Sequence, residues 1–281
     1  MTTARIAELA EDRVVEGIFA VARKRRFRTR GGSPYLALEL VDPSGRIDAR
    51  VWSDVELLDG RFGEGDAVRV LGRVERFRDR LQLEVRTLER AEMEAASLVP
   101  EPRREVEELD GFLDFIADEI THPDLRGLVT RFTSDSEFRV RLRQLPATAG
   151  GHHAWAGGLL EHTVGVATLC RDAAQLHPRL RSDLLLAGAL LHDVGRVREL
   201  DAGPLFLPTV EGKLLGHVHL GLRLIEERAG GIEPSVLAEL LHAVASHHDG
   251  RAARTPEAAV LYHANQLDSA AAARQPLSEE A

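Results

Sequence analysis

The chain has 281 residues, a single cysteine and a formal net charge of −9. This length allows one large domain or two modest ones, each with a buried core. The longest apolar stretch, counting Ala and Gly, runs from Leu184 to Leu191, far short of the ~20 residues that span a bilayer. Because the N-terminus is charged and Cys170 is alone, the sequence predicts a cytoplasmic protein without internal disulfides or a cysteine-rich zinc site.

The charge is divided unevenly along the chain. Residues 1–93 contain 18 basic and 17 acidic residues, whereas residues 94–281 contain 18 basic and 28 acidic residues. The acidic total argues against a protein that binds duplex DNA with its whole surface. It leaves room for a local basic site in the first half.

Five short β-strands are predicted in the first half, since its segments alternate or run apolar between turn signals. The strands cover residues 14–22, 34–42, 46–52, 66–77 and 80–89, with a brief helix at about 53–59. Gly72 lies inside the fourth strand and predicts a bulge or sharp bend of the kind that barrel corners require. Five strands and one short helix predict a small Greek-key barrel.

A strongly basic segment, RKRRFRTR at residues 23–30, lies between the first two predicted strands, and we expect it to form a loop. Such a loop can follow a phosphate backbone while its aromatic residue stacks on a base. The alternative is a solvated charged loop without a ligand. The candidate substrate-binding residues here are Arg23, Lys24, Arg25, Arg26, Phe27 and Arg28. Trp52 and Phe77 are weaker candidates for stacking on a base, and we expect both to pack within the barrel instead.

From about residue 105 the apolar residues change to helical spacing. The predicted helices cover about 105–121, 123–132, 134–144, 158–176, 182–193, 214–229, 234–247 and 256–270. The chain is therefore expected to be an α+β multidomain protein. Its predicted parts are a β-barrel domain at 1–93, a linker at 94–108, an all-α domain at 109–270 and a disordered tail at 271–281.

The histidines concentrate in the helical half, where eleven of the twelve fall between His152 and His263. A carboxylate such as Asp193, which follows a long apolar run, is costly to bury unless it is paired or bound to a metal. Helical bundles build metal sites from imidazoles and carboxylates that several helices donate to a common interior. Four segments have this character: GGHHAWAGGLLEHTVGVA (150–167), LAGALLHDVGRVREL (186–200), KLLGHVHLG (213–221) and ASHHDG (245–250), followed by HANQLDS (263–269).

Both halves resemble known families. GDAVRVLGRVERFRDRLQLEV (65–85) resembles the fourth and fifth strands of nucleic-acid-binding OB-fold domains, and DPSGRIDARVW (42–52) resembles their second hairpin. The resemblance implies a five-stranded OB-fold barrel, in which the connection between the first two strands often meets oligonucleotides. The ordered His and Asp segments resemble the HD superfamily of metal-dependent phosphohydrolases. Together, the halves look like the YhaM-type 3′→5′ exoribonucleases over roughly residues 5–270.

The resemblance implies a divalent metal site with two ions. The implied ligands are His162, His192, Asp193 and Asp268 for the first ion, and His217 with His247 or His248 for the second. Asp193 has two oxygens and could bridge the ions. Because successive helix residues point about 100° apart, we favour His247 over His248. A mixed imidazole and carboxylate site favours Mn²⁺, with Fe²⁺, Zn²⁺ or Mg²⁺ as other options.

The implied activity is a 3′→5′ exonuclease on single-stranded RNA, with single-stranded DNA as a further substrate, that releases nucleoside 5′-monophosphates. The catalytic candidates are His192, Asp193 and Arg196, and further substrate-binding candidates are His152, His153, Arg196 and Lys213. Arg196 stands where the family more often has lysine, and arginine can still clamp a phosphate.

Two other functions stay open at this point. One is an HD phosphohydrolase or phosphodiesterase that acts on free nucleotides or a nucleotide second messenger. The other is a nucleic-acid-binding adaptor whose HD domain is degenerate. The expected partner is a single-stranded nucleic acid, with RNA favoured over DNA and no membrane, and a homo-oligomer is an open alternative to a monomer.

Overall fold

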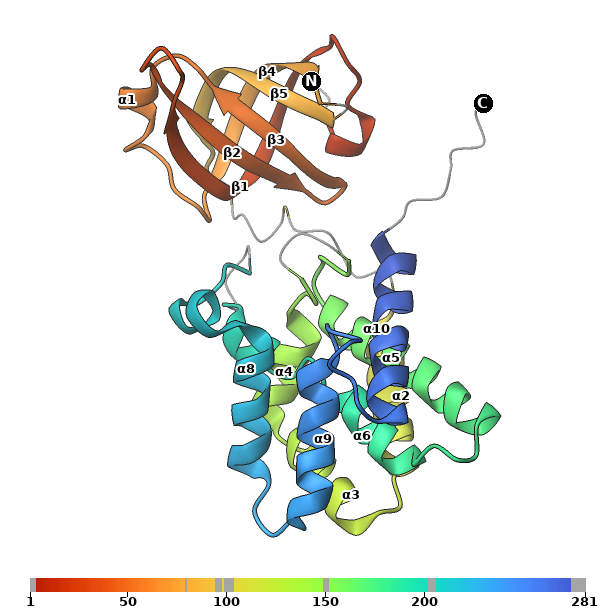
Figure 1. Ribbon diagram of the computed structural model, residues 1–281. Helices are drawn as coiled ribbons and strands as arrows, with labels where there is room; N and C mark the ends of the chain where they lie inside the picture. Colours follow the sequence, from red (N-terminus) through yellow and green to blue (C-terminus); the bar gives the residue numbers. More distant parts are fainter. Residues whose placement is uncertain are drawn as a thin grey trace. The chain divides into compact units, whose positions relative to one another are not determined.

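The computed structural model describes residues 4–78, 80–93, 98, 104–148, 152–201 and 206–273. The chain forms two compact units (Figure 1). The first consists of Met1–Glu101 with Gly203–Leu207, and the second of Pro102–Ala202 with Pro208–Ala281. Each unit is described by itself.

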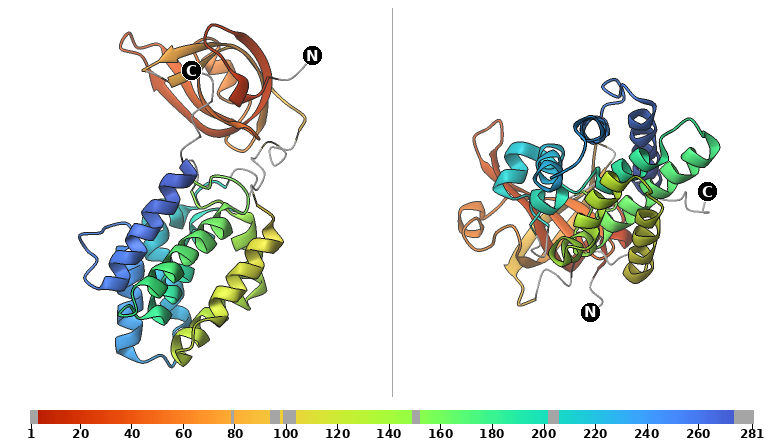
Figure 2. Two further views of the ribbon diagram at one scale, coloured as in Figure 1. Left: turned by 90° about the vertical axis from the view of Figure 1, so that its right-hand side faces the viewer. Right: turned by 90° about the horizontal axis from the view of Figure 1, so that it is seen from below.

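The first unit is a closed barrel of five strands in the order β1-β2-β3-β5-β4, and its ring of strands is visible in the left view of Figure 2. β3 and β5 are parallel, whereas the other neighbours are antiparallel. The elements are β1 (Val14–Arg28), β2 (Pro34–Asp42), β3 (Gly45–Val51), α1 (Val55–Leu58), β4 (Ala67–Phe77) and β5 (Arg80–Arg90). The predicted OB-fold class is confirmed.

Alternating side chains fill the barrel, because successive residues of a strand point to opposite faces. On β2, Leu36, Leu38 and Leu40 are fully buried in the barrel core. The register of β4 and β5 shifts next to Gly72, where a Cβ atom would lie 2.5 Å from the Glu84 carbonyl oxygen. Only glycine allows this approach of the two backbones, and the predicted irregularity at Gly72 is confirmed.

The basic segment is a strand rather than the expected loop. β1 continues to Arg28 and pairs with β2 as far as Pro34, so that only residues 29–33 form the connection. The expectation of a loop over residues 23–30 is wrong because the alternate residues Lys24 and Arg26 reach polar partners around α1, as described below, and strand pairing is therefore compatible with the charge.

The second unit consists of helices: α2 (Val106–Asp118), α3 (Pro123–Thr133), α4 (Ser136–Gln144), α5 (Gly158–Leu176), α6 (Ser182–Leu191), α7 (Arg196–Glu199), α8 (Val210–Arg228), α9 (Pro234–Ser246) and α10 (Pro256–Ala273). α5 packs against α2, α4, α6 and α10 (Figure 2). α6 is buried from Leu184 to Leu191, so the residues that follow it enter the interior of the unit.

Several helix boundaries differ from the prediction. α6 ends at Leu191 rather than 193, and the short helix α7 was not predicted. α8 begins at Val210 and is kinked at Gly216, whose φ of 71° and ψ of 162° are not helical. Most of the predicted linker and tail lies outside the described residues, although α10 continues to Ala273. Within the described ranges, no helix has both the length and the hydropathy that a membrane span requires.

Candidate metal centre

Two helices of the second unit end in the same way. His192 follows α6, and its Nδ1 donates to the Ala189 carbonyl oxygen at 2.8 Å. His247 follows α9, and its Nδ1 donates to the Val244 carbonyl oxygen at 2.5 Å. Each ring is buried and tied to the carbonyl three residues earlier. In a neutral imidazole held in this way, Nε2 keeps its lone pair, and both rings therefore present a metal-ligating nitrogen.

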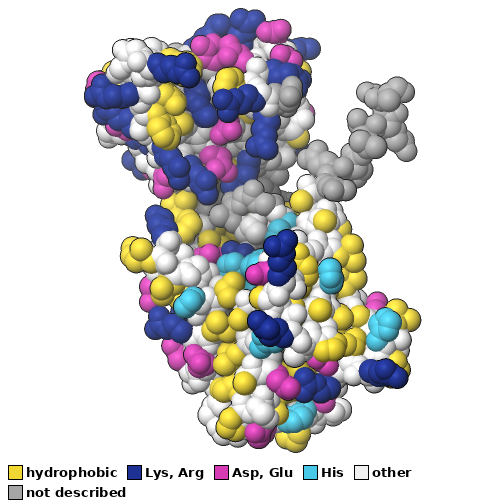
Figure 3. Space-filling model, viewed as in Figure 1, with side chains coloured by type: hydrophobic (Ala, Val, Ile, Leu, Met, Phe, Trp, Pro, Cys, Tyr) yellow, Lys and Arg dark blue, Asp and Glu magenta, His cyan; other side chains and the backbone are white. Residues whose placement is uncertain are grey.

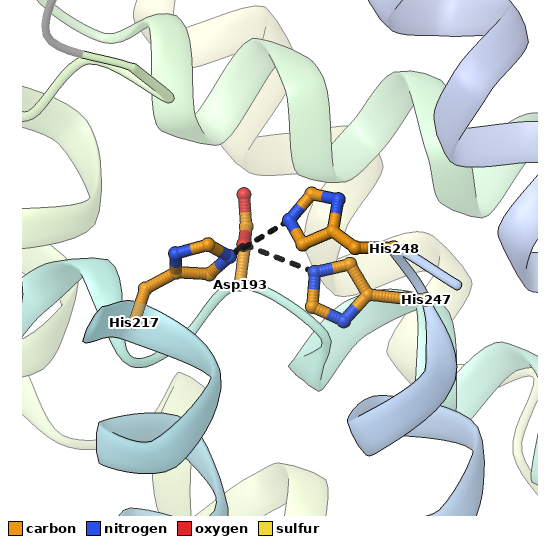
Figure 4. Close-up of side chains that lie close together, drawn as sticks. All are labelled: Asp193, His217, His247 and His248. Atoms are coloured by element: carbon orange, nitrogen blue, oxygen red, sulfur yellow. Dashed lines mark hydrogen bonds and ion pairs between the residues drawn. The ribbon is translucent and has the colours of Figure 1, made fainter. Parts of the chain in front are cut away.

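The Asp193 carboxylate lies between two groups of histidines. Its Oδ2 is 3.8 Å from His192 Nε2 and 3.9 Å from His162 Nε2. Its Oδ1 is 3.3 Å from His217 Nε2 and 3.6 Å from His247 Nε2 (Figure 4). The two oxygens thus face different sets of ring nitrogens, which is the arrangement of a carboxylate that can bridge two metal ions.

Two buried atoms of this centre lack a hydrogen-bond partner among the described residues, namely Asp193 Oδ1 and His247 Nε2. Both are acceptors, because the Nδ1 of His247 already donates to the backbone. Two acceptors 3.6 Å apart in a buried site repel each other unless a cation lies against both. The donor set therefore fits a divalent metal ion, with nitrogen and oxygen ligands and no sulfur.

The candidate ligand atoms form three overlapping groups, and within each group they lie within 4.8 Å of one another. The groups are His162, His192 and Asp193; Asp193, His217, His247 and His248; and His152, His153 and His162. His248 thus joins His247 in one group, which the argument from helical spacing did not anticipate. α9 ends at Ser246, so His248 does not follow helical geometry, and its Nε2 lies 2.9 Å from His217 Nε2.

Asp268 reaches the centre through His162. Its Oδ2 accepts a hydrogen bond from His162 Nδ1 at 2.6 Å and lies 3.6 Å from His153 Nδ1. Gly165 permits this approach, because a Cβ atom there would lie 2.3 Å from Asp268 Oδ1. Asp268 is in none of the three groups of ligand atoms. A carboxylate on the far nitrogen of a ligand imidazole fixes the tautomer and raises the basicity of the ring.

α7 adds a pair of charges beside Asp193. Arg196 Nε lies 3.5 Å from Asp193 Oδ2, and Arg196 Nη1 donates to Glu199 Oε2 at 2.5 Å. Glu199 Oε1 lies 3.6 Å from His217 Nδ1 and accepts from the His217 backbone N–H at 3.3 Å. Glu199 was not among the site residues predicted from the sequence. Its spacing of three residues from Arg196 places both on one helical face, which is the signal that could have found it.

Close backbone contact brings α8 to the centre. A Cβ atom at Gly195 would lie 1.9 Å from the His217 carbonyl oxygen and 2.4 Å from the Gly221 backbone nitrogen. The glycine of HDVG is therefore required for α8 to carry His217 to Asp193.

Comparisons with known proteins agree with this geometry. A family model of the OB-fold nucleic acid binding domain matches residues 18–91, and a model of the HD domain matches residues 159–270. The 3′-5′ exoribonuclease YhaM of Bacillus velezensis is 30% identical over 91% of this chain and 84% of that protein. The chain belongs to the YhaM family.

A second curated relative supports the same membership. YhaM of Bacillus subtilis is 32% identical over 85% of this chain and 79% of that protein. Among solved structures, the second OB-fold domain of replication protein A from Methanococcus maripaludis covers 33% of this chain and 97% of that chain, with 24% identity and a TM-score of 0.28.

The charge states of this YhaM-family centre suit metal binding. Burial lowers the pKa of His192 well below its usual value and brings the pKa of His152 and of His248 to about 4. Burial would raise the pKa of Asp193, but the nearby Arg196 and His192 hold it well below its usual value. His152, His192 and His248 are therefore neutral and Asp193 is ionised at neutral pH, the forms that bind metal ions.

The remaining candidates are placed as follows. His153 is buried and His152 is half-buried, and both rings pack against that of His162. Lys213 is exposed on α8, and its side chain has no hydrogen bond or ion pair within the described part of the chain. Asn265 on α10 is buried, and its amide donates to the His247 carbonyl oxygen at 3.0 Å, which ties α10 to the end of α9.

Proposed function

We propose that this chain is a metal-dependent 3′→5′ exonuclease that hydrolyses single-stranded RNA to nucleoside 5′-monophosphates. The observation that carries the proposal is the Asp193 carboxylate, whose two oxygens face two sets of histidine nitrogens in a buried site. The relatives named 3′-5′ exoribonuclease support the direction of hydrolysis and the choice of RNA.

The residues of the centre fit two divalent ions. We favour Mn²⁺ over Fe²⁺, Zn²⁺ and Mg²⁺ as the metal, because the donors are imidazoles and a carboxylate. One ion would be held by His162, His192 and Asp193, and the other by Asp193, His217, His247 and His248. When bound, such ions acidify a water molecule and neutralise the charge that develops on the phosphate. Asp268 is proposed to act through His162, whose Nδ1 it holds.

Arg196 is the proposed phosphate clamp. Its side chain is nearly buried and lies between Asp193 and Glu199, so its position is set before substrate arrives. A guanidinium group binds two phosphate oxygens in one plane, which orients the scissile phosphate toward the centre. His152 and His153, next to His162, are proposed to contact the terminal nucleotide of the RNA. Lys213 is proposed to contact a phosphate further along the RNA strand.

The test is a nuclease assay across metals and substrates. Single-stranded RNA with a 5′ label should shorten stepwise with Mn²⁺, and chromatography should recover nucleoside 5′-monophosphates. A DNA oligonucleotide, free nucleotides and a cyclic dinucleotide serve as competing substrates. Release of internal oligomers, or turnover of only the free nucleotides or the cyclic dinucleotide, would contradict the proposal. A preference for RNA over DNA, a cytoplasmic location and self-association stay predictions.

A further inference from the structure

Three aromatic side chains form a row on the outer face of the barrel. Phe27 on β1 pairs in register with Tyr35 on β2, and Trp52 directly follows Val51, which pairs with the β2 residue next to Tyr35. The ring centroids of Phe27 and Tyr35 are 5.6 Å apart, and those of Tyr35 and Trp52 are 4.8 Å apart. The interplanar angles are 27° and 32°, so the three rings form one tilted stack across the strands.

The residues at the two ends of this aromatic row are exposed. Phe27 is 43% exposed and Trp52 is 47% exposed, although Trp52 was expected to pack within the barrel. That expectation is wrong because Val51 is buried in the core and the next residue points outward. Exposed apolar rings are costly to keep in water, and a stack with open end faces can be extended by another flat ring.

Arginine side chains flank the aromatic row on the same face. Arg25 lies two residues before Phe27, and Arg50 lies two residues before Trp52, with the small Ala37 between them across the strands. Arg25 is exposed and its side chain has no hydrogen bond or ion pair with the described residues. On the visible face of the barrel in Figure 3, Lys and Arg side chains surround hydrophobic ones.

Lys24 and Arg26, the residues on either side of Arg25, have partners within the barrel unit. Lys24 Nζ donates to the Phe62 carbonyl oxygen at 2.7 Å and lies 3.0 Å from Asp59 Oδ1. Arg26 pairs with Asp59 at 3.2 Å and with Glu56. These two cations hold α1 and the segment after it. The β-strand thus divides the basic segment into a structural face, with Lys24 and Arg26, and a free face, with Arg25 and Phe27.

We propose that the row of Phe27, Tyr35 and Trp52 is a stacking site for unpaired nucleobases of RNA, with Arg25 binding an adjacent phosphate. Every base has a π-face, so stacking captures single strands of any sequence, and the free guanidinium adds attraction to the backbone. The inference rests on the proposed function in that it names the surface on which the barrel holds the substrate. It places bases on the open faces of Trp52 and Phe27.

Intrinsic fluorescence tests the site directly, because the chain has two tryptophans and Trp155 is buried in the other unit. The full-length Asp193→Asn variant is titrated with a single-stranded RNA in a metal chelator, so that no hydrolysis occurs. Binding should quench the tryptophan fluorescence. The Trp52→Phe variant should lose this quenching and keep its affinity within about twofold, since phenylalanine still stacks.

Alanine variants in the same background measure the contribution of each ring by fluorescence anisotropy of a labelled RNA. Phe27→Ala, Tyr35→Ala and Trp52→Ala should each weaken binding about tenfold. Phe77→Ala is the matched control, because Phe77 is 55% exposed but lies at the β4–β5 hairpin opposite Arg80. Circular dichroism confirms that the barrel is intact in each variant.

The outcomes separate this inference from the proposed function. Unchanged RNA affinity in all three alanine variants, or quenching that is undiminished in Trp52→Phe, would overturn the stacking site even if the enzyme degrades RNA normally. Loss of affinity in these variants supports the stacking site even if the wild-type chain hydrolyses no RNA, a result that would count against the nuclease alone.

Discussion

The two units place their chemistry in opposite environments. In the helical unit, His162, His192, Asp193 and His247 are buried, His217 is half-buried and His248 is exposed, and these candidate ligands come from segments far apart in the sequence. In the barrel, the candidate RNA contacts Arg25, Phe27 and Trp52 are exposed and Tyr35 is half-buried, and all lie on one face of three neighbouring strands. A buried polar group must have a partner, whereas an exposed one exchanges protein contacts for water at little cost. Substitutions in the two units should therefore differ in size as well as in kind.

The metal centre shows how strictly burial constrains a site. In each of four histidines, the ring nitrogen Nδ1 faces away from Asp193 and has an oxygen partner. For His192 and His247 the partner is a backbone carbonyl, and for His162 and His217 it is a carboxylate. These partners fix the rings before any ligand arrives. The barrel has no such arrangement around Arg25, whose side chain has no partner among the described residues.

The largest effect is expected at Asp193. The Asp193→Asn substitution removes the charge that faces both sets of histidines, and hydrolysis of RNA should fall by at least about 1,000-fold. RNA affinity in a metal chelator should stay within about twofold, because the barrel is untouched. Rates from a 5′-labelled RNA and affinities from anisotropy check both statements. Asp172→Asn, an exposed position on α5, should change neither, and equal loss in both variants would contradict the role of Asp193.

A smaller effect is expected at Glu199. The Glu199→Gln substitution keeps the shape of the side chain but removes the charge near His217 Nδ1 and Arg196. Affinity for Mn²⁺ should fall about 10- to 100-fold, as for other carboxylates that orient a ligand imidazole. Equilibrium dialysis with Mn²⁺ alone measures this without reference to activity. Glu227→Gln is the matched control, since Glu227 on α8 also pairs with an arginine of α7, Arg198, but is exposed. Equal Mn²⁺ affinity in both variants would leave Glu199 without a role in the centre.

Gly165 tests whether Asp268 acts through His162. The Gly165→Ala methyl group would lie 2.3 Å from Asp268 Oδ1 and displace the carboxylate from the imidazole, so Mn²⁺ affinity should fall about tenfold. The control is Gly188→Ala on α6, where the nearest atom is 3.4 Å away and contact is ordinary. Both substitutions favour helix by a similar amount. A Gly165→Ala variant with normal Mn²⁺ affinity would show that the Asp268 contact does not support the metal site.

The sequence predicted the helical site better than the barrel surface, for a physical reason. An ionisable pair such as His192-Asp193 after a fully apolar helix must be buried, so its need for a metal or a partner can be read from the pattern. The direction of a side chain past a helix end cannot be read in this way. For that reason His247 was favoured over His248, although both belong to one group of candidate ligand atoms.

The barrel strands were predicted by their alternation, whereas the basic segment was not. Five arginines and lysines in six residues suggest a solvated loop when the segment is considered alone. Its strand conformation depends on pairing with β2 and on carboxylates such as Asp59, which are distant in the sequence. Local propensity gives no information about such partners.

The smallest effect on RNA binding is expected at Arg25. Its neighbour Arg26 lies on the structural face, so alanine substitutions of the two residues compare the free face with the structural face. Arg25→Ala should weaken RNA binding only severalfold and reduce the slope of log affinity against log salt by about 0.7, the loss of one phosphate contact on a single strand. Arg26→Ala should leave that slope unchanged and lower the melting temperature, because it removes the partner of Glu56 and one of the partners of Asp59. Anisotropy titrations at several salt concentrations and thermal unfolding separate the two variants. Because the residues are neighbours in sequence, an equal change of slope in both would mean that the whole basic segment attracts RNA by its charge alone, and that the strand does not divide it.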